Sequence, residues 1–148
     1  MYDSTTPGEI PTAVEAVCGY LDGLWSWTPA DFARFPYALK YGVVVDWTFM
    51  AGHFIDCERG DATVTQAAGW AHARLLSGAP WVGIYCNLST WPSARAAATG
   101  LPITWWIADP TGEQHAVPGA AATQWAWPGA GSGGHFDVSF VPAGFPLP

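Results

Sequence analysis

The sequence predicts an α/β fold, a compact barrel of the (β/α)8 TIM type in which several helices are shortened or missing. Eight short apolar segments recur along the 148 residues, and Gly, Pro or Asp bounds each of them, as expected for buried strands. Some intervals between these segments have helical periodicity, whereas others are too short for a helix. Since a complete barrel of this type has about 250 residues, we expect a trimmed one. An open parallel sheet is the alternative.

The expected elements follow one another along a single domain of residues 1–148. Strands are expected at residues 1–4, 17–21, 43–47, 53–58, 80–85, 103–108, 122–127 and 136–141. Helices are expected at residues 9–17, 30–40, 63–76 and 89–99, the first of them brief and broken at Pro11. Residues 142–148, which include three Pro, are expected to form an extended tail on the surface.

Two of these helices have clear boundary signals. Thr28-Pro29 places an N-cap residue before a Pro at the first helical position, which predicts the start of the second helix. The third has the strongest pattern, because Val64 and Ala71 belong to an apolar series at helical spacing and Gly78 follows the last turn.

The composition restricts the partners. With a net charge of −7 and only five Lys or Arg, the chain cannot build a basic surface, so nucleic acid is not expected as a partner. No apolar segment is long enough to cross a membrane, and no membrane partner is expected. Most of the ten Trp are expected in the core. An acidic surface that also exposes some Trp suits a neutral or cationic ligand such as carbohydrate.

The cysteines and histidines predict neither a disulfide framework nor a metal site. Cys18, Cys57 and Cys86 each lie in an apolar segment, so we expect three reduced, buried thiols. The four His are scattered along the chain, and no metal or other cofactor is expected. The first residues lack the basic start and apolar segment of a secretory signal, so no signal peptide is expected.

Asp56 and Glu58 are the first candidates for chemistry. Side chains alternate along a strand, so these two carboxylates point to the same face, while Ile55 and Cys57 point to the other. A pair of carboxylates at the end of a strand is what glycosidic bond cleavage needs, one as the acid and one as base or nucleophile. The alternative is a solvated strand end whose charges cap the next helix.

Further polar side chains end the other expected strands. Together with that pair they are Asp3, Asp22, Asp46, Asp56, Glu58, Asp109, Gln124 and Asp137. Active sites of (β/α)8 barrels lie at the C-terminal ends of the strands. The sequence therefore predicts a site built from several strands at that end.

Several short motifs occur in an order that resembles that of a known protein family. The motifs are Asp3, Ile55-Asp56-Cys57-Glu58, Val82-Gly83-Ile84-Tyr85, Trp105-Trp106-Ile107-Ala108-Asp109, Thr123-Gln124-Trp125 and Phe136-Asp137-Val138. In this order they resemble glycoside hydrolase family 25, the lysozyme-type muramidases. The opening segment Asp3-Ser4-Thr5-Thr6-Pro7 is more similar to a related glycoside-hydrolase-like domain of bacteria and phages.

The resemblance implies cleavage of the β-1,4 bond after N-acetylmuramic acid in peptidoglycan. It makes Glu58 the general acid and Asp56 either the nucleophile or the group that orients the substrate's acetamido group. It makes Asp3 and Asp137 ligands of the sugar. The cleft would be lined by Tyr85, Trp106 and Gln124. We expect the four carboxylates to share one cleft, where mutual repulsion raises the pKa of at least one of them.

A second reading gives the same fold a non-catalytic role, either as a glycan-binding module or as a structural virion protein. The absence of a secretory signal and a composition typical of a GC-rich genome favour a phage origin. The protein is then expected in the virion, or in the host cytoplasm before its release to the cell wall. Its expected partners are cell-wall glycan in the first reading and other virion proteins in the second.

Overall fold

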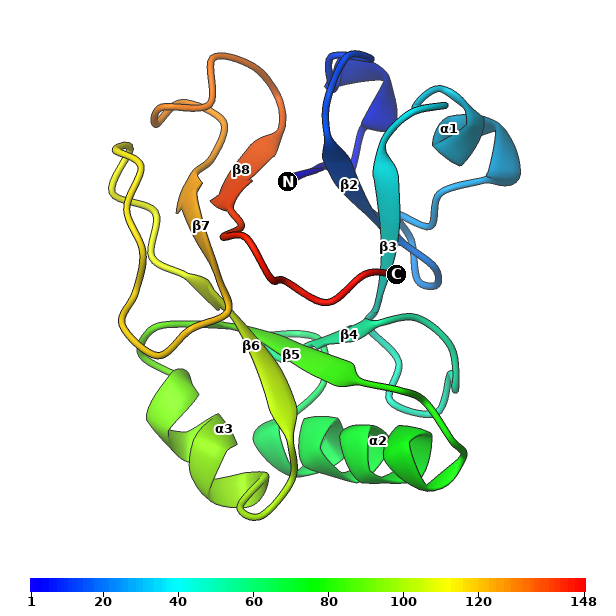
Figure 1. The fold of residues 1–148 in the computed structure, drawn as a ribbon, viewed down its shortest axis with the longest axis vertical. Helices are drawn as coiled ribbons and strands as arrows, with labels where there is room; N and C mark the ends of the chain where they lie inside the picture. Colours follow the sequence, from blue (N-terminus) through cyan, green and yellow to red (C-terminus); the bar gives the residue numbers. More distant parts are fainter.

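Eight strands close into a barrel in the computed structural model, which describes residues 1–148, and they follow one another in sequence order (Figure 1). The strands are β1 (Tyr2–Asp3), β2 (Ala16–Tyr20), β3 (Leu39–Val44), β4 (Phe54–Asp56), β5 (Val82–Asn87), β6 (Ile103–Ala108), β7 (Ala122–Ala126) and β8 (Asp137–Phe140). The first seven are parallel, and β8 is antiparallel to both of its neighbours, β7 and β1. The expected α/β class and barrel are confirmed, and the open sheet is wrong.

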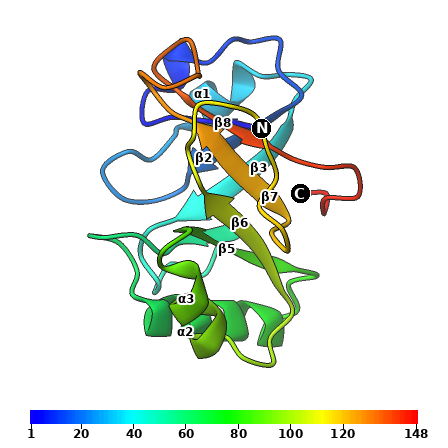
Figure 2. The ribbon, with the colours of Figure 1, turned by 90° about the vertical axis from the view of Figure 1, so that its left-hand side faces the viewer.

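Three α-helices and one 3-10 helix accompany the strands. They are η1 (Pro7–Glu9), α1 (Pro29–Ala33), α2 (Val64–Leu76) and α3 (Trp91–Ala97). The expected helix at 63–76 is confirmed, and a capping box starts it: Gln66 N donates to Thr63 Oγ1, and Thr63 N donates to Gln66 Oε1 at 2.9 Å. Both α2 and α3 lie on one side of the barrel, beside β4, β5 and β6 (Figure 1, Figure 2). None of the helices is long and apolar enough to span a membrane.

Two expected helices are wrong in type or length, and Pro explains both. The expected helix at 9–17 is replaced by the short η1 and irregular chain, because the residue before Pro11 is disfavoured in the helical region and Ile10 is extended. The expected helix at 30–40 ends after one turn as α1, before Pro36. Leu39 already begins β3, four residues before the expected strand start.

Side chains alternate between the inside and the outside of the barrel. On the outside, Ile55, Ile84 and Ile107 are fully buried in the same cluster as Trp70 of α2. On the inside, a second cluster contains Ala16, Cys18, Tyr41, Val43, Phe54, Tyr85, Trp106, Ala108 and Ala122. The helices α2 and α3 therefore cover only the part of the barrel that presents these Ile side chains.

Loop aromatics cover the part of the barrel that has no long helix. Trp27 and Phe35 form a third cluster with Val17 of β2 and with Phe136, which precedes β8. The indole nitrogen of Trp27 donates to the Ser4 carbonyl at 2.9 Å, so this large side chain is also fixed in orientation. These contacts bury strand surface that crossover helices cover in a full (β/α)8 barrel.

The tail is exposed over most of its length, as expected of a surface segment, but it lies across one end of the barrel. Residues 142–148 cross the end of the barrel where the parallel strands begin, which we call the N-terminal mouth (Figure 1). The Phe145 ring packs 5.5 Å from the Tyr41 ring and 6.1 Å from the Phe54 ring, centroid to centroid. The Tyr41 hydroxyl donates to the Pro146 carbonyl at 2.9 Å. The tail therefore covers part of this mouth.

The three thiols are free and buried, as predicted. Cys18 faces the barrel interior, whereas Cys57 and Cys86 belong to the outer cluster. Burial raises the pKa of Cys57 to about 11 and that of Cys86 to about 12, so both remain protonated near neutrality.

Candidate functional site

Four carboxylates gather at the opposite end of the barrel, the C-terminal mouth. Asp3 ends β1 and Asp56 ends β4, while Glu58 follows two residues later. Because β8 is antiparallel, its first residue, Asp137, lies at this same mouth and pairs directly with Asp3. The orientation of β8 thus adds a carboxylate to the end where the parallel strands finish.

Burial and mutual repulsion act together on Asp3 and Asp137. Asp3 is only 5% exposed, and burial raises its pKa well above the ordinary value, with a further contribution from the charge of Asp137 and a smaller one from Glu58. The Met1 ammonium opposes this shift. The pKa of Asp137 is raised to about 6, first by burial and then by Glu58. The pKa is raised at this mouth as expected, but burial contributes more to the rise than the expected mutual repulsion.

Asp56 and Glu58 differ in their exposure. Asp56 is 3% exposed, and burial, followed by the charge of Glu58, raises its pKa well above the ordinary value. Glu58 is half-buried, and its pKa is raised by burial and then by Asp61. Of the two, Glu58 is the carboxyl group that solvent or a ligand reaches more readily.

No cationic side chain neutralises this cluster. The one ion pair in the molecule joins His115 Nε2 to Asp109 Oδ2 at 3.0 Å, and none of the Lys or Arg side chains lies within 4.0 Å of a carboxylate oxygen. One oxygen each of Asp3 and Asp56 is buried without a hydrogen-bond partner. An unpaired buried carboxylate is costly, so these groups either hold a proton or receive a partner from a ligand.

The other expected strand-end carboxylates have structural roles. Asp22 accepts hydrogen bonds from the backbone amides of Val45 and Asp46, at 2.8 and 2.9 Å, and so fixes the end of β3. The Asp46 carboxylate accepts from Thr48 N at 2.8 Å. Asp109 is paired with His115. These three therefore do not join the cluster at the mouth.

The three side chains expected to line the cleft lie beneath it, inside the barrel. Tyr85, Trp106 and Gln124 are 7%, 1% and 4% exposed. The Tyr85 hydroxyl donates to Gln124 Oε1 at 2.6 Å. Trp106 Nε1 donates to Ser139 Oγ at 2.9 Å. They form a hydrogen-bonded floor below the carboxylates and offer no exposed aromatic face.

A cavity of about 150 Å³ opens at the C-terminal mouth. Its lining includes Asp3, Ser4, Tyr20, Pro128, His135 and Asp137, whereas neither Asp56 nor Glu58 lines it. The sequence reasoning missed Tyr20, which ends β2 beside Asp3. One sequence signal could have identified Tyr20: it lies two residues after Cys18 and therefore on the same face of the strand.

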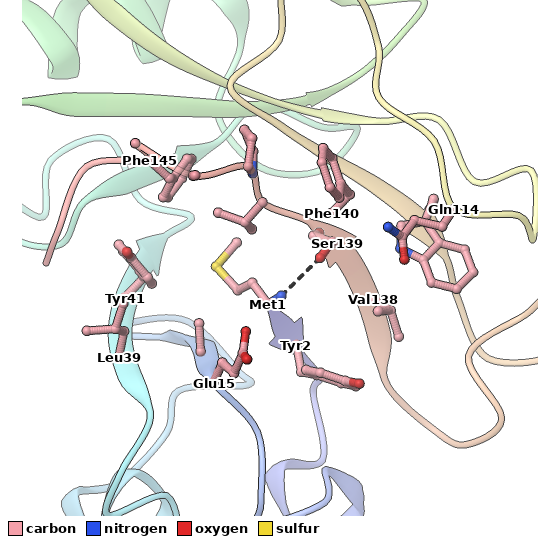
Figure 3. A pocket seen from close by; sticks show the side chains of 16 residues that line it. Met1, Tyr2, Glu15, Leu39, Tyr41, Gln114, Val138, Ser139, Phe140 and Phe145 are labelled. Carbon is pink, nitrogen blue, oxygen red and sulfur yellow. Dashed lines mark hydrogen bonds between the residues drawn. The ribbon is translucent and has the colours of Figure 1, made fainter.

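The largest cavity, about 520 Å³, lies at the other end of the barrel and is walled in part by the tail (Figure 3). Figure 3 shows Met1 at its centre, where the amino group donates to the Ser139 carbonyl at 2.9 Å. Glu15 is the one carboxylate among its lining side chains. A choice of the candidate site by cavity volume alone would therefore give the end of the barrel that lacks the carboxylate cluster.

Exposed Trp side chains lie in loops at the C-terminal mouth, and the sequence analysis did not identify them as site residues. Trp25, Trp47 and Trp127 follow β2, β3 and β7 and are 53%, 44% and 43% exposed. Trp27, only two residues after Trp25, is buried, so the residue type alone does not distinguish the two positions. Flat exposed indoles suit stacking against sugar rings.

The side chains do not form a metal centre, since no three His, Cys, Asp or Glu converge closely enough to hold an ion. Among known proteins, no family model, no curated sequence and no solved structure matches this chain.

Proposed function

We propose that this chain is a glycoside-hydrolase-like domain that cleaves bacterial cell-wall peptidoglycan, built on a trimmed (β/α)8 barrel of the TIM type. The observation that carries the proposal is the convergence of four carboxylates at the C-terminal mouth without a cationic partner. Seven parallel strands and the helices α1, α2 and α3 in three of their connections support the trimmed barrel. The antiparallel β8 is its departure from the regular form.

Glu58 acts as the general acid in this proposal. It is half-buried, and its raised pKa favours the protonated form that donates to the leaving glycosidic oxygen. Asp56, at the end of β4, is more deeply buried and serves as the nucleophile or orients the acetamido group of the substrate. Asp3 and Asp137 hold the sugar from the neighbouring strands β1 and β8.

The test compares the lysis of bacterial cell walls by the wild type and by Glu58→Gln in a turbidity assay. Loss of a general acid lowers the rate by about 10²–10⁴-fold, and we expect a loss of this size. Glu15→Gln is the matched control, because Glu15 is an exposed carboxylate at the N-terminal mouth. A Glu58→Gln variant that is folded and lyses walls at the wild-type rate rules out this acid.

The second candidate is a non-catalytic role, as a glycan-binding module or a structural virion protein that contacts other virion proteins. One observation favours it: the mouth cavity is about 150 Å³, and neither Asp56 nor Glu58 lines it. Under this reading, the wild type leaves peptidoglycan uncut across the pH range while glycan binding or assembly into the particle persists. The same turbidity assay, combined with a measurement of how much protein sediments with cell walls, separates the two candidates.

A further inference from the structure

We propose that the mouth cavity between Asp3 and Asp137 binds a primary ammonium group of the glycan, namely the free amino group of a 2-amino-2-deoxy sugar that carries no acetyl group. The inference rests on the proposed function, since it specifies which sugars the site accepts. It assigns a ligand chemistry to a cavity that the proposed cleavage step does not itself explain.

Asp3 is the first observation. Its side chain is 5% exposed and lines the cavity, and its Oδ1 is buried without any hydrogen-bond partner. A buried carboxylate is retained at low cost only when a cation or several donors satisfy it. Asp137, its direct partner on β8, lines the same cavity and adds a second carboxylate instead of a cation.

No Lys, Arg or His side chain lies within 4.0 Å of either carboxylate, although His135 lines the same cavity. The Lys and Arg side chains are engaged elsewhere: Arg34 with Gly8 O, Lys40 with Ala38 O, Arg74 with Met50 O and Gly52 O, and Arg95 over the Trp91 ring. Arg59 is exposed and pairs with no carboxylate. The Met1 ammonium donates to the Ser139 carbonyl. When they are ionised, these two carboxylates therefore have no ion-pair partner within the protein, and a ligand can supply one.

The shape and the acceptors of the cavity favour an ammonium group. A volume of about 150 Å³ corresponds to roughly five water molecules at ~30 Å³ each, enough for an amino group and its neighbouring ring atoms. An ammonium has three donors, and the cavity lining offers the carboxylates of Asp3 and Asp137 together with Tyr20 as acceptors. The side chains do not suit a metal ion.

An acetylated amino group fits this chemistry poorly. The acetamide is neutral, offers one N–H donor and adds a methyl group, so it leaves the two carboxylates without a charged partner. The free ammonium instead forms charge-assisted hydrogen bonds, which are stronger than those of a neutral amide. The cavity thus discriminates between the two forms of the same sugar.

Binding should release a proton. In the free protein burial favours the protonated form of the Asp3 carboxyl. An ammonium beside it favours the carboxylate, so the carboxylic acid gives its proton to the solvent buffer and a carboxylate–ammonium pair forms. The number of protons released is measurable from the binding enthalpy in two buffers of different ionisation enthalpy.

The experiment is calorimetric titration of the full chain near neutral pH with the trimer of glucosamine and, separately, the trimer of N-acetylglucosamine. We expect at least tenfold tighter binding of the amino trimer, together with proton release. Asp3→Asn and Asp137→Asn should each abolish this preference. Glu15→Gln, which removes the same charge at the other mouth, should retain it. If Asp3→Asn fails to fold, Asp137→Asn carries the same test.

Three outcomes overturn the inference. The first is equal or tighter binding of the acetylated trimer. The second is equally tight binding of spermidine, which would reflect net charge alone. The third is displacement of the amino trimer by a lysine-containing stem peptide that binds more tightly. The last outcome would assign the ammonium to the peptide part of the wall. A preference for the amino trimer without any wall lysis would refute the enzymatic proposal only. Lysis by a protein that shows no such preference would refute this inference only.

Discussion

The Tyr85 hydroxyl donates a 2.6 Å hydrogen bond to Oε1 of Gln124, joining β5 to β7 across the interior of the barrel. Both side chains are buried. Because Tyr85 uses the oxygen of the Gln124 amide, the nitrogen is left for other acceptors, and the Gln124 side chain partly offsets the rise that burial causes in the pKa of Asp137. The floor of the barrel is therefore linked to a carboxylate at the C-terminal mouth.

Tyr85→Phe should destabilise the protein by about 1–3 kcal/mol, because it leaves a buried amide oxygen without its donor. Urea unfolding measures the change in the free energy of unfolding. Tyr37→Phe is the control, since Tyr37 is 97% exposed and should tolerate the loss of its hydroxyl. Equal stabilities of Tyr85→Phe and the wild type would mean that the Tyr85–Gln124 bond contributes nothing.

Asp137→Asn should raise the melting temperature at pH 7 and leave it unchanged at pH 3. Below the ordinary pKa of 3.8 the carboxyl is protonated in both the folded and the unfolded state. Between 3.8 and about 6 the unfolded chain loses this proton while the folded state retains it, so wild-type stability falls as the pH rises. Melting curves from pH 3 to pH 8 measure the difference. A lower melting temperature of the Asn variant at pH 7 would show that the carboxylate is a stabilising partner.

His115 should titrate above 6.5, because both ring nitrogens face acceptors. Nδ1 lies 2.9 Å from the Glu113 carbonyl oxygen and Nε2 lies 3.0 Å from Asp109 Oδ2, so only the doubly protonated ring donates to both. The Glu113 carbonyl and then Asp109 raise its pKa. The stabilisation is therefore complete below 6.5 and is lost as the pH rises through the folded-state pKa.

NMR titration of the His115 ring protons measures this pKa directly. In Asp109→Asn the pKa should fall without returning fully to the ordinary value, because the Glu113 carbonyl remains in place. An unchanged titration curve in this variant would exclude the ion pair with Asp109 in solution.

Phe145→Ala should destabilise the protein by less than the roughly 3–5 kcal/mol typical of a fully buried Phe→Ala substitution, because Phe145 is only half-buried. It removes contacts of the tail with Tyr41, Phe54 and Trp81 at the N-terminal mouth. Leu147→Ala is the control, since Leu147 is 70% exposed and its anchoring hydrogen bond, accepted from Trp81 Nε1, uses the backbone carbonyl. If both variants unfold at the same urea concentration as the wild type, the tail does not cover the N-terminal mouth in solution.

Local patterns in the sequence were sufficient for most of the elements. The strand at residues 103–108 was predicted with the bounds of β6, and the helix at 63–76 has its N-cap at Thr63, because apolar spacing, capping residues and Gly are local signals. The gathering of Asp3 and Asp56 at one mouth also followed from strand ends alone, whereas Asp137 begins its strand and reaches this mouth only because β8 is antiparallel. Parallel strands bring their C-terminal ends together, whatever packs around them.

Contacts between distant segments decided the rest. Leu39 is the start of β3 because it pairs with Ala16 of β2, and the antiparallel direction of β8 depends on its pairing with both β7 and β1. The tail crosses the N-terminal mouth because Phe145 fits among aromatic rings from β3, β4 and the start of β5. Which acids line the mouth cavity likewise depends on the packing of β1, β2 and β8 around it. Periodicity along one segment reports which face is buried, but it carries no information about which distant segment covers that face.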